Sequence, residues 1–319
     1  MPRRPQREDP RLLSKVSKLY YEQGLTQQEI SERLHLSRPK VSRLLQRARE
    51  DGIVQITVVS PSGVYPDVEA RLEAMYDLEE AVVVDVAQPS SQEAVSREVG
   101  VAAALYLQRT LADGQVIGIS WGTTLNAMVS SLVPTPLRRC HVVQILGGLG
   151  PPEAETHATD LCRRMAHALG CKLTLLPAPG IVDSQEAKAV ILSDVYVQRA
   201  MALFEKLDVA FVGIGAPTPN SVVMQAVSML GLRELNDLVA QGVVGDIALR
   251  FFDAEGRPVP SDLDRRVIGI TLEELKRVPR VVGVAGGPQK PQTIRAALRG
   301  RLINVLITDH VTAMELAQE

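Results

Sequence analysis

QVIGISWGTTL, residues 115–125, begins as a short apolar run, turns at a glycine and continues as the start of a helix. Similar apolar runs recur along the chain, separated by amphipathic helical stretches: AVVVDVA (81–87), HVVQILGG (141–148), KLTLLPAPG (172–180), VAFVGIG (209–215), RVVGVAGG (280–287) and INVLITD (303–309). Strands that are apolar almost throughout and alternate with helices predict a mostly parallel sheet covered on both faces. The sequence therefore predicts a Rossmann-like α/β domain.

Two loops at the predicted strand ends carry groups that suit a phosphate. The helix expected to begin near Thr123 exposes amides and hydroxyls at its positive end. Lys290 follows a Gly-Gly pair at another strand end and offers a point charge. Alone, the first loop is an ordinary strand-to-helix turn and the lysine a surface residue. Because ligands bind beyond the carboxyl ends of parallel strands, the two together favour one shared phosphate site.

Further polar residues at the same predicted edge could bond the hydroxyls of a ligand. Asp246 and Gln144 are equally well explained as a turn cap and an edge residue, and Trp121 could stack on a ligand or lie in the core. Asp309 is expected to cap the last helix rather than to bind. The complete set of expected ligand-binding residues is Ser120, Trp121, Gly122, Thr123, Thr124, Gln144, Gly147, Gly148, Asp246, Gly287 and Lys290.

The first part of the chain has a different pattern. From Arg11 to Arg49 apolar residues recur at helical spacing, with breaks near Gly24 and at 35–37, which predicts three short helices. Residues 52–59 read as a strand, and the Ser-Pro-Ser-Gly sequence that follows breaks it. We therefore expect a helix-turn-helix domain over residues 1–55 and the α/β domain over residues 56–319.

The second and third predicted helices of the helix-turn-helix domain have clear start signals. Thr26 and Glu29 have the spacing of a capping box, in which hydroxyl and carboxylate satisfy free amides at the helix start. Ser37 can cap the next helix, and Pro39 follows in its first turn, where a missing amide hydrogen matters little. Two capped helices joined by a short turn are typical of a helix-turn-helix.

The helix after Ser37 has one apolar face and one polar, cationic face. At 100° per residue, its apolar side chains cluster on one side, so Ser42, Arg43 and Gln46 point the other way. A solvated helix face explains any one of them, but the combination favours a helix in the major groove, with Arg43 reading guanine and Gln46 adenine. The expected DNA-binding residues are Thr26, Gln27, Ser37, Arg38, Pro39, Lys40, Ser42, Arg43, Gln46 and Arg47.

Charge, cysteine content and hydropathy narrow the class of protein. Residues 1–55 hold 12 Lys and Arg against 7 Asp and Glu, while the rest of the chain holds 23 against 30. Only the helix-turn-helix domain is therefore expected to bind a polyanion. The 3 cysteines lack metal-ligand spacing and are expected to be inert thiols, with no metal or cofactor. No apolar run is long enough to span a membrane and no signal peptide is evident, so we expect a cytoplasmic protein.

Several motifs in order along nearly the whole chain resemble the SorC family of sugar-responsive transcription regulators. They are TQQEISERLHLSRPKVSRLLQRAREDGIVQI (26–56), GISWGTTL (118–125), QILGGLG (144–150), GIGAP (213–217), GDIALRFFDAEG (245–256) and VAGGPQKPQTIRAALRGRLINVLITDHVTA (284–313). The resemblance implies a sensor domain similar to sugar-phosphate isomerases, with a phosphorylated sugar as effector. It implies a regulator of a carbohydrate-metabolism operon that binds double-stranded operator DNA.

Two other functions compete with this interpretation. A sugar-phosphate isomerase would need a base such as Asp246 or Asp309, but no pairing of residues specifies proton transfer, so we do not expect an enzyme. A constitutive architectural DNA binder would leave the α/β domain without a role. Since one recognition helix reads only a few base pairs, we also expect a homo-oligomer, either a dimer or a tetramer.

Overall fold

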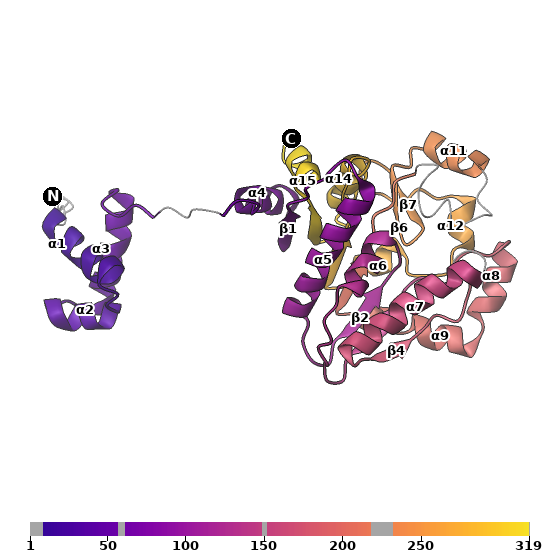
Figure 1. The fold of residues 1–319 in the computed structure, drawn as a ribbon, viewed down its shortest axis with the longest axis horizontal. Coiled ribbons are helices and arrows are strands. Elements are labelled where there is room, and N and C mark those ends of the chain that lie inside the picture. The colour runs from indigo at the N-terminus through magenta and orange to yellow at the C-terminus, as the bar shows by residue number, and fades with distance from the viewer. Residues whose placement is uncertain (1–8, 57–60, 149–151, 218–231, 319) are drawn as a thin grey trace, which may run out of the picture. The chain divides into compact units, whose positions relative to one another are not determined.

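The computed structural model describes residues 9–56, 61–148, 152–217 and 232–318. The chain forms two compact units, residues 1–60 and residues 61–319. In Figure 1 the first unit is indigo to purple, and the second runs from purple through magenta and orange to yellow. Each unit has its own hydrophobic core and is described by itself.

The first unit is a small helical bundle. Its elements are α1 (Pro10–Ser17), a π-helical turn η1 (Lys18–Glu22), α2 (Gln27–Leu34) and α3 (Arg38–Glu50). Their inward side chains form one core, comprising Leu13, Val16, Leu19, Ile30, Val41, Leu44, Leu45 and Ala48. The three predicted helices are confirmed, and the first continues through η1 to Glu22.

The strand expected over residues 52–59 is not found in the part of it that the structure describes. Residues 53–56 carry no strand, and 57–60 lie outside the described residues. Gly52 has a φ of 70°, which turns the chain back over the end of α3. The amide of Val54 then donates to the carbonyl of Ala48 at 3.0 Å, and Val54 packs against the helical core. Of the apolar residues that suggested a strand, Val54 therefore covers a helix end, whereas Ile53 and Ile56 are exposed.

The second unit is built on a seven-stranded sheet in which every pairing is parallel. In chain order its strands are β1 (Glu80–Val84), β2 (Val116–Ile119), β3 (His141–Gln144), β4 (Lys172–Thr174), β5 (Val209–Val212), β8 (Arg280–Val284) and β9 (Val305–Asp309). Across the sheet the order is β1-β9-β8-β5-β2-β3-β4. Each of the seven apolar runs in the sequence corresponds to one of these strands, with β1 beginning one residue before its run, which confirms the predicted α/β fold.

Helices cover both faces of this sheet. They are α4 (Pro66–Tyr76), α5 (Gln92–Thr110), α6 (Thr123–Ser130), α7 (Pro152–Leu169), α8 (Gln185–Leu192), α9 (Val195–Met201), the 3-10 turn η2 (Phe204–Lys206), α11 (Leu232–Ala240), α12 (Asp262–Arg266), α13 (Leu272–Leu275), α14 (Pro291–Arg299) and α15 (His310–Leu316). Along β5, Val209 and Phe211 belong to the core beneath α5, α6 and α7, whereas Ala210 and Val212 belong to the core on the other face. This two-sided burial explains why the strands are apolar throughout.

The strand order creates a crevice at the middle of the sheet. From β2 the chain moves outward to β3 and β4, and then returns to place β5 on the other edge of β2. The carboxyl ends of β2 and β5 therefore lie at a topological switch point, where open α/β sheets bind ligands. A two-stranded antiparallel hairpin, β6 (Gly245–Ile247) and β7 (Arg250–Phe252), bridges to Gly215 beyond β5. The sequence reading did not predict this hairpin.

Candidate functional site

A cavity of about 170 Å³ lies at this switch point. Its walls come from the loops that follow β2, β5 and β8, from the β6–β7 hairpin and from the start of α5. The lining residues are Gln92, Ser120, Trp121, Gly122, Thr123, Thr124, Leu125, Gly213, Ile214, Gly215, Ala216, Asp246, Ala248, Leu249, Val284, Ala285, Gly286, Gln289 and Lys290. The sequence-predicted loops around Thr123 and Lys290 thus meet in one cavity.

The first turn of α6 supplies backbone donors to the cavity. Gly122 precedes the helix with a φ of 145°, a conformation that glycine adopts readily, and no side chain caps the helix there. The carbonyl of Gly122 accepts the first helical bond from Asn126 at 2.8 Å, so the amides before Asn126 have no carbonyl in a preceding turn. Such amides at a positive helix end are suited to binding an anion.

Two neighbouring hydroxyls at this end of the sheet are already held by hydrogen bonds. The amide of Gly213 donates to Ser120 Oγ at 3.4 Å, and Thr124 Oγ1 donates to Ser96 Oγ at 3.3 Å. Ser120 is buried, and its own amide donates to the carbonyl of Phe211 at 3.1 Å. The loop after β2 is therefore fastened to the loop after β5, which fixes the geometry of the cavity floor.

A buried acid, Asp246, and a half-buried base, Lys290, face the same cavity. Burial raises the pKa of the Asp246 carboxyl above its ordinary value, although the nearby Lys290 ammonium acts in the opposite direction. Burial likewise lowers the pKa of Lys290, against the attraction of Asp246. Lys290 Nζ donates to the carbonyl of Ile214 at 2.7 Å, and Asp246 Oδ2 accepts from the amide of Leu249 at 3.2 Å. Both charged groups are thus oriented by the backbone rather than by a direct ion pair.

Gly215 allows the Asp246 carboxylate to lie against the loop after β5. The two residues exchange backbone hydrogen bonds of 2.8 and 3.1 Å, and a Cβ atom on Gly215 would overlap the Asp246 carboxylate. A side chain at position 215 would therefore displace the acid from the cavity wall.

Four of the expected ligand-binding residues are not among those that line the cavity. Gln144 is buried and donates to the carbonyl of Leu146 at 2.8 Å, because β3 continues past its end as a bridged segment. The amides of Gly147 and Gly148 donate to carbonyls of Ile268 and Ala178, each at 3.0 Å. Gly287 donates to Asp309 Oδ2 at 2.7 Å. In this structure these polar groups form hydrogen bonds between neighbouring segments and do not line the cavity.

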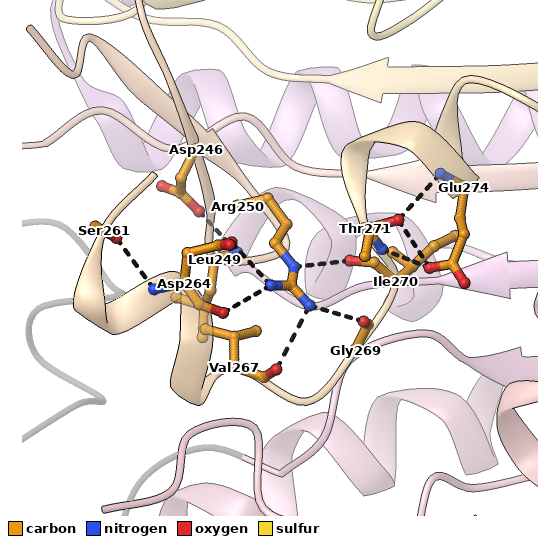
Figure 2. Close-up of polar contacts among 10 residues, drawn as sticks. All are labelled: Asp246, Leu249, Arg250, Ser261, Asp264, Val267, Gly269, Ile270, Thr271 and Glu274. Atoms are coloured by element: carbon orange, nitrogen blue, oxygen red, sulfur yellow. Dashed lines mark hydrogen bonds and ion pairs between the residues drawn. The ribbon is translucent and has the colours of Figure 1, made fainter. Parts of the chain in front are cut away.

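Figure 2 shows how the hairpin that carries Asp246 is held in place. Its turn, Ala248 and Leu249, has positive φ angles of 52° and 61°, which are unfavourable for residues with side chains. The buried Arg250 guanidinium next to this turn donates to the carbonyls of Gly269 and Ile270, each at 3.0 Å, and to Asp264 Oδ1 at 2.8 Å. These bonds, together with the bond from Leu249 to Asp246, maintain the unfavourable turn.

Sequence reasoning missed Gln92 and the turn formed by Ala248 and Leu249. Gln92 Nε2 donates to the carbonyl of Gly286 at 3.0 Å, so the start of α5 closes one side of the cavity. The only local signal was Ser91, whose hydroxyl caps α5. The turn has neither glycine nor asparagine to mark it.

Asp309 caps α15, with its Oδ1 accepting from the amide of Thr312 at 2.9 Å, as expected.

Other kinds of site find little support in the described residues. Within them no cluster of three or more His, Cys, Asp or Glu side chains could hold a metal ion, and no helix is long and apolar enough to cross a membrane. Burial raises the pKa of both Cys162 and Cys171 to about 12, which keeps these thiols protonated at neutral pH.

The helix-turn-helix has the local geometry that its sequence predicts. The amide of Glu29 donates to Thr26 Oγ1 at 3.3 Å, and the amide of Thr26 donates to Glu29 Oε2 at 2.8 Å, which completes the capping box. The bonds that Glu29 Oε2 accepts from the amide and the hydroxyl of Thr26 lower the pKa of the Glu29 carboxyl. His35, in the left-handed conformation, ends α2. Ser37 occupies the N-cap position of α3, but its side chain makes no capping hydrogen bond there.

The polar face of α3 is exposed along its length. Its apolar residues are buried, whereas all of the outward and flanking residues are exposed: Arg38, Pro39, Lys40, Ser42, Arg43, Gln46, Arg47 and Arg49. Arg47 pairs with Glu50 and Asp51 at 3.5 and 3.1 Å, and Gln46 Nε2 donates to Glu50 Oε1 at 3.0 Å. Within the residues that the structure describes, Lys40 and Arg43 make no ion pair, so both are available to a ligand.

Comparison with protein families assigns a class to each unit. The family model described as "Putative sugar-binding domain" matches residues 65–318, and the model described as "Winged helix-turn-helix DNA-binding" matches residues 19–55. The larger match contains all of the cavity, and the smaller contains α2 and α3.

Curated and solved relatives align over nearly the whole chain. The "Deoxyribonucleoside regulator" of Bacillus subtilis is 33% identical, covering 98% of this chain and 99% of the relative. The "Transcriptional regulator LsrR" of Escherichia coli is 31% identical, covering 94% of this chain and 92% of the relative. The crystal structure of the full-length sorbitol operon regulator SorC from Klebsiella pneumoniae matches with a TM-score of 0.74 and 32% identity, covering 97% of this chain and 99% of that one. These relatives are transcriptional regulators and not enzymes.

Proposed function

Because the chain belongs to the SorC family of sugar-responsive transcription regulators, we propose that a phosphorylated sugar, bound in the cavity at the switch point, controls its affinity for operator DNA. Residues 1–55 form the DNA-binding domain in this proposal, and residues 56–319 form the sensor. Binding or release of the ligand would thereby change the transcription of a carbohydrate operon.

The main support for a phosphate ligand is that Lys290 and the first turn of α6 line the same cavity. A half-buried ammonium and the first-turn amides of α6, which line one cavity, provide charge and directed donors, both of which a phosphate needs. An uncharged sugar would leave the Lys290 ammonium with only Asp246 as a nearby counter-charge. The phosphorylated end of the ligand therefore belongs between Lys290, Ser120 and Thr123, and its hydroxyls belong near Asp246.

The DNA-binding proposal rests on the exposed face of α3. Arg43 and Gln46 lie at the centre of this face and carry the donors that read base edges in the major groove. Lys40, Arg38 and Arg47 lie on its flanks, where cations neutralise phosphates. Thr26, Gln27 and Ser37 lie at the starts of α2 and α3, from which they would contact the backbone of the duplex.

The test measures ligand binding and operator binding separately. We expect glucose, sorbitol, ribose or deoxyribose monophosphate to raise the melting temperature of the full chain, because a ligand that binds only the folded state stabilises it. The unphosphorylated sugars serve as matched controls. Lys290→Met and Thr123→Ala should remove the response to the phosphorylated compound at the operator, while operator binding without ligand stays near that of the parent.

The operator for these measurements is selected by the parent chain from a pool of random duplexes. A free sugar that stabilises the chain as strongly as its monophosphate would overturn the phosphate assignment. If both variants respond to the monophosphate as the parent does, the ligand binds elsewhere.

A further inference from the structure

The α/β unit begins next to the DNA-binding unit in the sequence, and its first helix, α4, starts directly after Tyr65. Tyr65 lies four residues after Pro61, where the unit begins, and occupies the N-cap position of α4. Its carbonyl accepts from the amides of Val68 and Glu69, each at 3.0 Å. Tyr65 therefore fixes the beginning of α4, four residues from the start of the α/β unit.

Two side chains from the carboxyl ends of β1 and β9 hold Tyr65. Its hydroxyl donates to Asp85 Oδ1 at 2.6 Å, and its ring stacks on the His310 ring at a centroid distance of 5.5 Å and an interplanar angle of 8°. His310 Nδ1 accepts from the amide of Val86 at 3.3 Å and lies 3.7 Å from Asp85 Oδ1. We call Tyr65, Asp85 and His310 the entry cluster.

Strand register explains why the cluster assembles. Val84 and Asp309 are partners in the parallel pairing of β1 with β9, so the residues that follow them, Asp85 and His310, leave the sheet side by side. The hydrogen bond to the Asp85 carboxylate raises the pKa of Tyr65, which keeps the hydroxyl protonated as a donor.

The residue next to His310 is fastened to the cavity. Asp309 is 1% exposed, and its Oδ2 accepts from the amide of Gly287 at 2.7 Å and from Thr312 Oγ1 at 2.6 Å. Gly286 lines the cavity, and a Cβ atom there would overlap the Asp309 carboxylate. The loop that carries Gly286 and Lys290 is thus bonded to Asp309, which shares a peptide bond with His310.

We infer that the entry cluster couples the cavity to the chain entry, with Tyr65, Asp85 and His310 as positioning residues for operator binding. This inference rests on the proposed function. A ligand that moves the loop after β8 strains the bond from Gly287 to Asp309, because hydrogen bonds weaken steeply as their angle becomes unfavourable, and this strain favours a shift of Asp309 with the loop. Asp309 then turns His310, against which Tyr65 is stacked. The start of the α/β unit, to which the DNA-binding unit is joined in sequence, then changes position with the ligand.

The experiment removes one hydrogen bond from the entry cluster and leaves its ring stack in place. Tyr65→Phe is compared with Tyr76→Phe, a matched control on the same helix whose hydroxyl donates to the carbonyl of Leu316 in α15 at 3.1 Å. The probe is whichever of the four sugar monophosphates shifts the parent's melting temperature most. The readout is the ratio of operator dissociation constants with and without this probe. We expect Tyr65→Phe to shrink that ratio about two- to fivefold, the effect of one exposed hydrogen bond, and Tyr76→Phe to preserve it.

A second variant separates coupling from stability. His310→Ala should shrink the ratio further, and the double variant Tyr65→Phe with His310→Ala should lose no more than His310→Ala alone, because the residues act as one contact. The thermal shift given by the probe should be the same in every variant. A parental ratio in Tyr65→Phe, an equal loss in Tyr76→Phe, or additive losses would overturn the inference while the proposed function stands. If no monophosphate shifts the parent, the proposed function fails and the inference falls with it.

Discussion

Individual residues of the cavity are constrained by close packing, which makes Gly215 a sensitive position. Gly215→Ala should destabilise the chain by about 1–3 kcal/mol, because the added Cβ atom forces the Asp246 carboxylate out of place. It should also weaken binding of the sugar monophosphate. Gly213→Ala is the matched control, since a Cβ atom there meets only the carbonyl oxygen of Trp121 at 3.6 Å. Chemical denaturation measures both variants, and equal losses would show that position 215 is not specially packed.

At the DNA-binding face, single residues separate base reading from phosphate binding. Arg43→Ala should cost about 1–3 kcal/mol of operator affinity and relax discrimination at one base position. Lys40→Ala should weaken binding to operator and to unrelated duplexes alike, and should flatten the dependence of affinity on salt. Fluorescence anisotropy over a range of salt concentrations measures both. If Arg43→Ala leaves base preference unchanged, α3 is oriented differently in the groove.

At the scale of elements, the two N-caps of the helix-turn-helix differ although their residue types are alike. Thr26→Ala should lower the free energy of opening of α2 by about 0.5–2 kcal/mol, because the capping box satisfies amides that would otherwise be free. Ser37→Ala should change the opening of α3 by less than about 0.5 kcal/mol, since its side chain makes no capping bond. Hydrogen exchange of the helix amides in the full chain tests this. Equal effects at both caps would contradict it.

The strands of the parallel sheet could be predicted from the sequence, whereas those of the hairpin could not. Apolar runs, several of which end in glycine, serine or aspartate, identified the seven strands of the parallel sheet in the described residues, because burial on both faces leaves a strong signal. The hairpin over 245–252 gave no such signal: its strands are three residues each, and Ala248 and Leu249 occupy a turn that usually takes glycine or asparagine. Its conformation depends on Arg250 and on segments distant in sequence.

The candidate site was predictable where function depends on local sequence. Thr123 and Lys290 stand out because a helix start and a lone cation at strand ends have chemical meaning on their own. Gln92 reaches the cavity only through the packing of α5 against the loop after β8, and Gln144 is directed away from it by segments that extend β3. Neither outcome can be derived from spacing along the chain.

At the scale of the whole molecule, the size of the recognition surface predicts assembly into an oligomer. One copy of α3 presents Arg43 and Gln46 at the centre of its polar face, enough to read only a few base pairs. Useful specificity needs two copies on half-sites separated by about one helical turn of DNA, about 10 base pairs, or by a multiple of it. We therefore expect a dimer or tetramer in solution, joined mainly through the α/β unit.

Light scattering on the full chain at micromolar concentration, free and bound to its selected operator, measures this assembly. Inserting about 5 base pairs between the half-sites turns one of them to the opposite side of the duplex, so affinity should fall sharply, whereas inserting about 10 should restore much of it. Two linked units gain affinity only while both can engage at once, which is why the loss should exceed that caused by changing any single base. A monomer in both states, or an affinity indifferent to the insertions, would mean that one copy of α3 suffices, and that the sensor acts on a single DNA-binding unit rather than on the spacing of two.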